Sequence, residues 1–268
     1  MGFLFPDYNK PGPGVDPEAP RKRGVFRLWE VFSRDYWFIM LTGLLALAGM
    51  LPFIAGTLIA YRTHSLLIMF LAGLAGGIIA APGICGLADV LLRCLRDEPG
   101  FWWYRYKTAM KRNWKGSLLP GVLFGAVFSI QCFTLLHLSQ SGTGLGMFVC
   151  QLVSMLVSVS LFLYVLMQIA LMELPLKKML KNSIWLSIRY LPKTLLASLA
   201  QLVYWLAIVL FFPVTATIML LTSIWLPLLI AFVGLYPAID DVFQIESRLQ
   251  EEQGKEETGS EKKKMKGE

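Results

Sequence analysis

Charged residues are scarce in this chain of 268 residues, making up only 16% of it. Soluble domains typically carry about 25% charged and about 45–50% apolar residues. Here apolar residues reach 56%, and the mean hydropathy is +0.58. Too little charge remains to cover the surface of a soluble fold of this length. This argues against an ordinary cytosolic enzyme, a coiled coil and a disordered protein.

Residues that carry chemistry are also few. Between Tyr36 and Ile239 the acids are Asp89, Asp97, Glu98 and Glu173. The sequence has two histidines, His64 and His137, and it lacks Walker A, HExxH and GxSxG motifs. Its four cysteines have no CxxC spacing, so we interpret them as small packing residues. The sequence therefore predicts no enzymatic activity, no cofactor and no metal site.

Long apolar runs, by contrast, are abundant. Six are long enough to cross a bilayer, which takes about 20 helical residues. They lie at 36–61, 66–92, 118–138, 145–172, 195–212 and 214–238. Pro213 divides the last long run, because proline removes a backbone donor and clashes with the preceding turn. The alternative is one fused, kinked helix. The predicted fold class is all-α, a polytopic membrane protein with six transmembrane helices.

The basic residues indicate how these spans are oriented. Of the 25 lysines and arginines, 24 lie in the N-terminal segment, the 93–117 and 173–193 connections, and the C-terminal segment. The other three connections hold only Arg62. Basic residues stay on the cytoplasmic side, so we expect both termini there, in the plasma membrane. The net charge of +7 then reflects topology, and no nucleic-acid partner is expected.

The chain also contains a weak internal repeat. Arg34, Arg112 and Arg189 each precede a span and are 78 and 77 residues apart. An amphipathic segment lies upstream of each, as expected for a helix on the membrane surface. We predict three parallel repeats of an interfacial helix plus a helical hairpin, although any three basic approaches to a membrane could look alike.

The expected division of the chain follows from this repeat. It comprises a cytoplasmic Pro/Gly-rich leader at 1–24, a six-span domain at 25–248 with repeats at about 25–101, 102–178 and 179–248, and a disordered charged tail at 249–268. No signal peptide is expected before the first span, because the apolar run there is too long for a cleavable one.

Small residues recur every four positions in the second span. One ladder is Ala72, Gly76 and Ala80, and a second ladder beside it is Gly73, Gly77 and Ala81. Such ladders let helix backbones approach closely in lipid, so we expect this helix to be central in the bundle. A homodimer contact is the alternative. Pro82 is expected to bend the inner half of the helix.

Polar residues at membrane depth are candidates for a functional site. We select Asp89, Arg93, Gln131, Gln151, Gln168 and Gln201. Asp89 and Arg93 have the spacing of an i,i+4 ion pair, or Asp89 could bind a cation or proton. The glutamines could line a cavity for neutral solutes or form hydrogen bonds between helices. Glu173 more simply marks the end of the fourth span.

A second candidate is a basic and aromatic surface in the 93–117 connection. Its cations are Arg105, Lys107, Lys111, Arg112 and Lys115. Anionic lipids of the inner leaflet attract such segments, so we predict a lipid-binding or partner-binding face here.

Three segments carry a family resemblance. They are Tyr8–Val15 followed by Arg21–Arg23, then Ala81–Ala88, and Arg96–Lys107 running into Lys111–Lys115. Together they resemble the YesL-like family of bacterial multi-pass membrane proteins, whose function is unknown. The resemblance covers most of residues 5–120. One departure is Ala81-Pro82, where the family usually has Gly-Pro.

The resemblance implies a plasma-membrane protein associated with sugar import, and it supplies no catalytic residues. We therefore expect a non-enzymatic accessory or scaffold protein that acts beside a carbohydrate uptake system, with a sugar-transporter subunit as its partner. The alternative is a small-solute transporter or channel, for a sugar or an ion.

Overall fold

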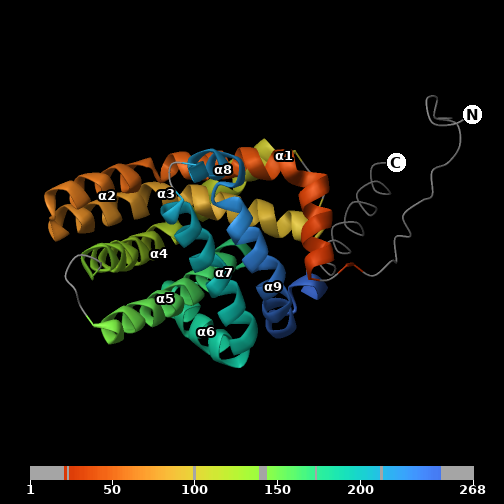
Figure 1. The fold of residues 1–268 in the computed structure, drawn as a ribbon. Helices are drawn as coiled ribbons and strands as arrows, with labels where there is room; N and C mark the ends of the chain where they lie inside the picture. Colours follow the sequence, from red (N-terminus) through yellow and green to blue (C-terminus); the bar gives the residue numbers. More distant parts are fainter. Residues whose placement is uncertain are drawn as a thin grey trace, which may run out of the picture.

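The computed structural model describes residues 21–22, 24–98, 101–138, 144–172, 174–211 and 214–248 (Figure 1). Throughout these ranges the regular structure is helical, which confirms the predicted all-α class. The predicted leader is described only at residues 21–22 and 24. The predicted tail at 249–268 and Glu173 lie outside the described residues.

Nine α-helices lie in the described part of the chain. They are α1 (Val25–Gly49), α2 (Leu51–Thr63), α3 (Leu66–Leu95), α4 (Trp102–Leu138), α5 (Leu145–Leu171), α6 (Leu176–Arg189), α7 (Leu191–Leu210), α8 (Val214–Thr222) and α9 (Trp225–Phe243). Six of these, α1, α3, α4, α5, α7 and α9, are long and apolar enough to cross a membrane. The prediction of six such helices is therefore confirmed. The bounds predicted for the first and the sixth span are not confirmed.

The first predicted span, 36–61, was wrong as a single uninterrupted helix. It is divided at Met50, where α1 ends and α2 begins. Pro52 lies in the first turn of α2, where its missing N–H costs nothing, but its ring clashes with a continuing turn before it. The two helices nevertheless run along the same side of α3 (Figure 1).

The sixth predicted span, 214–238, was also wrong in its boundaries. Residues 214–222 form the separate helix α8, and α9 begins only at Trp225. Ser223 lies between them with a left-handed φ of 45°, and its hydroxyl donates to the Gly43 carbonyl at 2.9 Å. This contact joins residues 180 positions apart, so no local sequence pattern predicts it. The predicted division near Pro213 is confirmed, because α7 ends at Leu210 and α8 begins at Val214.

Of the three predicted interfacial helices, only α6 is a separate helix. It ends at Arg189, because Pro192 in the first turn of α7 prevents a continuous helix. The other two predicted interfacial helices are not separate. Each is continuous with the span that follows it, the first within α1 and the second within α4. Among the described residues, the first hairpin includes the additional helix α2 and the third includes α8, so the units differ in their helices. The threefold repeat therefore stays a prediction.

Helix α3 is central, as its small residues predicted. It contacts α1, α2, α4, α5 and α9. The ladder that contains Gly76 faces α1 and α2, and the Gly73 and Gly77 ladder faces α4. A β-carbon on Gly77 would lie 2.2 Å from the Gly121 carbonyl oxygen of α4. The two backbones are thus in direct contact. Helix α3 continues through Pro82 without ending.

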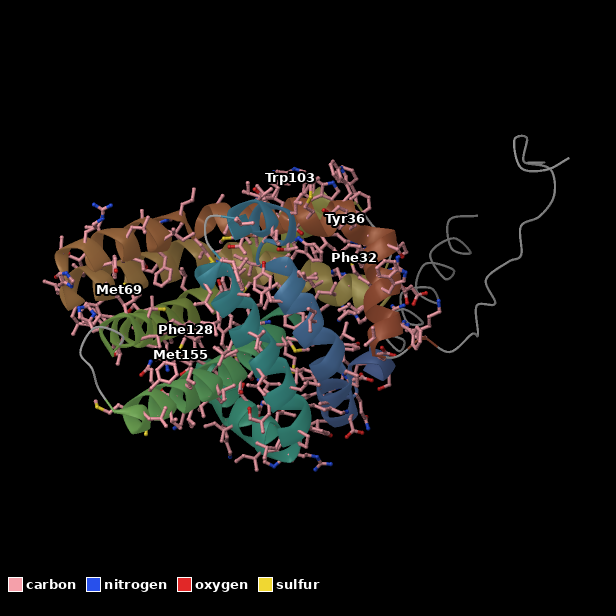
Figure 2. All side chains as sticks on the ribbon, viewed as in Figure 1. Phe32, Tyr36, Met69, Trp103, Phe128 and Met155 are labelled. Carbon is pink, nitrogen blue, oxygen red and sulfur yellow. The ribbon has the colours of Figure 1, made fainter. Side chains whose placement is uncertain are left out.

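The buried core lies toward one end of the bundle. It is built from the last turns of α3 and α5 together with α1 and α9, and Trp225 is fully buried within it. Phe32 and Tyr36 of α1 contact the Trp225 ring, with centroids 6.0 and 5.8 Å apart. Figure 2 shows these two aromatics at the opposite end from Met69 and Phe128. At the other end of the bundle, α2 and α5 expose large apolar side chains, as helices that face lipid do.

Candidate functional site

The end of α3 carries three of the rare acids. Asp89 lies in the last two turns of the helix, and Asp97 and Glu98 lie in the turn that follows. Helix α3 runs through the centre of the bundle, so its end is surrounded by the basic starts of α1 and α4. We call the three acids and the arginines that contact them the arginine–carboxylate cluster.

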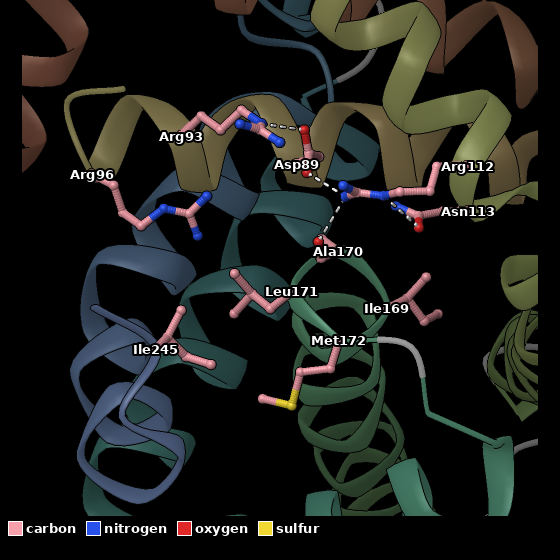
Figure 3. A pocket seen from close by; sticks show the side chains of 10 residues that line it. All are labelled: Asp89, Arg93, Arg96, Arg112, Asn113, Ile169, Ala170, Leu171, Met172 and Ile245. Atoms are coloured by element: carbon pink, nitrogen blue, oxygen red, sulfur yellow. Dashed lines mark hydrogen bonds and ion pairs between the residues drawn. The ribbon is translucent and has the colours of Figure 1, made fainter. Parts of the chain in front are cut away.

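Asp89 is almost fully buried, at 3% exposure. Its Oδ2 accepts from Arg93 Nε at 2.7 Å, which is the predicted i,i+4 pair. Its Oδ1 accepts from Arg112 Nη2 of α4 at 3.1 Å. Arg112 also donates to the Ala170 carbonyl at the end of α5, at 3.3 Å (Figure 3). Asp89 thus joins three helices through two arginines.

Asp97 forms ion pairs with three arginines from the N-terminal part of the chain. Arg27 Nη2 lies 2.6 Å from Asp97 Oδ2, and Arg21 Nε lies 3.2 Å from the same oxygen. Arg34 pairs with the other oxygen. Arg21 also pairs with Glu246 at 2.6 Å, beyond the last helix. This part of the cluster therefore connects α1, the end of α3 and the segment after α9.

Glu98 forms ion pairs with arginines of α3, of α4 and of the turn between them. Arg93 Nη1 and Arg96 Nε each lie 2.5 Å from a Glu98 oxygen, and Arg105 Nη1 lies 3.5 Å away. Arg93 bridges Glu98 and Asp89, so these two parts of the cluster are continuous.

Both acids of the turn titrate below their ordinary range. Burial alone would raise the pKa of the Asp97 carboxyl, but hydrogen bonds from Arg34 and Arg27 outweigh it and lower the pKa. Burial likewise opposes ionisation of Glu98, whose pKa is lowered by its hydrogen bond from Arg96 and by the charges of Arg96, Arg93 and Arg105. Both groups are therefore carboxylates at neutral pH.

Two cavities flank Asp89, and both are bordered by Arg93 and Arg112. The first, about 210 Å³, lies between the ends of α3 and α5 and the start of α4, and it is also bordered by Arg96, Asn113 and Ile245 (Figure 3). The second, about 430 Å³, is bordered by Tyr104, Arg105 and other residues at the start of α4. Neither is bordered by a candidate glutamine.

The four candidate glutamines lie in three other places, away from Asp89 and Arg93. Gln131 of α4 donates to Ser154 and Ser158 of α5, and Gln151 donates to the Gln131 carbonyl. Gln168 donates to Ser183 of α6 at 2.9 Å. Gln201 donates to the Pro227 carbonyl of α9 at 2.6 Å. Each glutamine therefore makes hydrogen bonds between helices, which is one of the two roles predicted from the sequence.

The predicted basic face divides into two sides of α4. Arg105 and Arg112 turn toward the cluster, where they contact Glu98 and Asp89. Lys107, Lys111 and Lys115 are four residues apart and exposed, so they form a stripe along the other side. The exposed rings of Trp103 and Trp114 accompany it. We call these three lysines and two tryptophans the lysine stripe.

The repeated arginines illustrate what sequence reasoning missed. Arg34 contacts Asp97 and Arg112 contacts Asp89, whereas Arg189 stacks on the Trp185 ring at 5.0 Å. The spacing in the sequence predicts only the pair of Asp89 with Arg93, because partners 23 or more residues away leave no spacing pattern. The available signal was the rarity of acids, since an acid near a membrane span needs a cationic partner.

The cluster is suited to electrostatic binding. Among the described residues no group of three His, Cys, Asp or Glu side chains could hold a metal ion, and the four cysteines are free. His64 and His137 lie together at the far end of the bundle, with ring centroids 5.6 Å apart.

Comparisons of the chain with protein-family models, with curated proteins and with solved structures find no match.

Proposed function

We propose that this chain is a non-enzymatic scaffold of the bacterial plasma membrane, with both termini in the cytoplasm, that assists carbohydrate uptake. The observation that carries the proposal is that its candidate polar residues at membrane depth are already hydrogen-bonded to neighbouring helices. Side chains that are used in this way hold neighbouring helices together. The resemblance to the YesL-like family supplies the link to carbohydrate uptake.

The lysine stripe is the surface that we assign to the partner. Lys107, Lys111 and Lys115 are exposed on one side of α4, while Trp103 and Trp114 are 44% and 48% exposed beside them. Tryptophan is enriched at protein interfaces and in the lipid headgroup region, where basic side chains also attract anionic groups. A transporter subunit that presents acidic residues at the membrane surface is the partner with matching charge.

Affinity purification from native membranes in mild detergent tests this role. We expect the tagged protein to recover a sugar-transporter subunit. The triple variant Lys107→Gln, Lys111→Gln and Lys115→Gln should lose it. A matched variant with Lys177→Gln, Lys178→Gln and Lys181→Gln removes three exposed lysines from α6 and should keep it. Recovery of no transporter subunit above background would overturn the scaffold role.

A transporter is the second candidate function, favoured by the two cavities beside Asp89. Purified protein in liposomes would then carry a sugar or an ion at a rate above that of empty liposomes. Asp89→Asn would abolish this flux in protein that still elutes as a folded species. Flux that the variant leaves unchanged, or no flux at all, would exclude this role for Asp89.

A further inference from the structure

Two buried donors border the smaller cavity without acceptors. Among the described residues, no acceptor lies within hydrogen-bond distance of Arg96 Nη1 or Asn113 Nδ2. Arg96 is 8% exposed and Asn113 is 5% exposed, so bulk water does not replace the missing partners. Leaving a buried donor unpaired costs about 1–3 kcal/mol, and more for a charged group, so two such donors at one cavity call for an acceptor.

The orientation of the Asn113 amide is set by its neighbour. Arg112 Nε donates to Asn113 Oδ1 at 3.4 Å, so the amide oxygen is already used and the nitrogen remains free to donate. Figure 3 shows the guanidinium groups of Arg96 and Arg112 extending toward one another from opposite sides of the cavity. The unsatisfied groups are therefore donors that come from the turn after α3 and from α4.

The charge around the cavity is positive. Arg93, Arg96 and Arg112 border it together with one carboxylate, that of Asp89. When Glu98 and Arg105 are included, four arginines face two carboxylates. Both oxygens of Asp89 already accept from arginines, so it offers little to a cation. The Ala170 carbonyl at the end of α5 is likewise occupied by Arg112.

We infer that this cavity binds a phosphate group, held by Arg96 Nη1, Asn113 Nδ2 and the guanidinium of Arg112. Phosphate oxygens accept several hydrogen bonds at once, and arginine is the side chain best matched to them. A water molecule needs about 10–15 Å³ of such space, so a cavity of about 210 Å³ has room for a phosphate group and its remaining waters. The cavity is separate from the lysine stripe, so its occupancy does not depend on the scaffold role.

The phosphate can come from a lipid headgroup or from a free phosphate in the cytoplasm. Calorimetric titration of the delipidated protein in neutral detergent distinguishes the two. One titration uses inorganic phosphate at constant ionic strength, and the other uses mixed micelles that contain phosphatidylglycerol, with phosphatidylcholine micelles as the reference. Binding of inorganic phosphate identifies a free ligand. Saturable binding of phosphatidylglycerol alone identifies a headgroup.

Two variants test the residues, and a third controls for charge. We expect Arg96→Gln and Asn113→Ala each to weaken binding about tenfold or more, because each removes a hydrogen bond to a charged ligand. Lys178→Gln removes an exposed cation from α6, outside the cavity and the lysine stripe, and should change binding less than twofold. Asn113→Ala keeps the proposal testable if Arg96→Gln fails to fold, because Asn113 lies outside the ion pairs.

Two results would overturn the phosphate site. The first is no binding of either probe to the wild-type protein. The second is binding that neither variant weakens.

Discussion

At the scale of single residues, Asp89 is the most deeply buried acid of the cluster. Its carboxylate is buried and accepts from Arg93 and Arg112, so Asp89→Asn leaves two arginines with one neutral partner. Breaking a buried pair in this way costs about 3 kcal/mol. We expect the variant to unfold at a lower temperature in detergent. Asp241→Asn, which alters an exposed carboxylate bonded to the Tyr190 hydroxyl, is the control and should change the midpoint little.

Acid should weaken the same cluster. The pKa values of Asp97 and Glu98 are lowered by folding from ordinary values of 3.8 and 4.5. Their ionised forms therefore stabilise the folded state fully above pH 4.5, and this contribution is lost as the pH falls through the lowered folded values. Thermal unfolding in detergent from pH 7 to pH 3 measures the loss. The double variant Asp97→Asn, Glu98→Gln should be less stable at pH 7 and lose less on acidification. An equal loss in both proteins would contradict this role.

The candidate residues show where sequence reasoning succeeds and where it stops. The pair of Asp89 with Arg93 is predictable, because both side chains lie on one face of one helix. The contact of Asp89 with Arg112 depends on how α3 and α4 cross, and that geometry is set by packing along their whole length. The same holds for Arg27 and Asp97, which are 70 residues apart.

At the scale of secondary-structure elements, the contact between α3 and α4 depends on glycine. A β-carbon on Gly121 would lie 2.5 Å from the Gly77 carbonyl oxygen, whereas one on Gly116 of the same helix would meet nothing within 4 Å. We expect Gly121→Ala to destabilise the folded protein by about 1–3 kcal/mol through overpacking. Gly116→Ala should leave it unchanged or slightly more stable, because alanine favours helix.

Thermal unfolding of the two purified glycine variants checks this comparison. Equal midpoints for Gly121→Ala and Gly116→Ala would mean that α3 and α4 do not touch as described. The central place of α3 was predictable from its small residues, since close approach leaves a sequence pattern. The helix that each ladder contacts was not predictable, because α1, α2 and α4 all carry small residues that could pack against either ladder.

Helix boundaries were predictable where proline acts locally. The division expected near Pro213 is present, because α7 ends at Leu210 and α8 begins at Val214. Pro192 lies in the first turn of α7, directly after α6 has ended. The break at Ser223 has a different origin. Its left-handed backbone is supported by a hydrogen bond to Gly43, 180 residues away, and by Trp225, which packs against that glycine. No local pattern reports such support.

At the scale of the whole molecule, the alternation of basic connections predicts three external turns. Gly142→Cys in a background without native cysteines should react with a membrane-impermeant thiol reagent added to intact cells. Ser260→Cys in the same background should react only after the cells are permeabilised, because both termini are expected inside. Protection of residue 142 in intact cells would contradict the proposed orientation.

The arginine–carboxylate cluster also has a consequence for biosynthesis. Arg21 contacts both Asp97 and Glu246, and Glu246 leaves the ribosome only after α1 to α9 have been made. Before that moment the nascent protein presents Arg21 without its second partner. Incompletely translated molecules therefore differ from finished ones in the pairing of this exposed arginine.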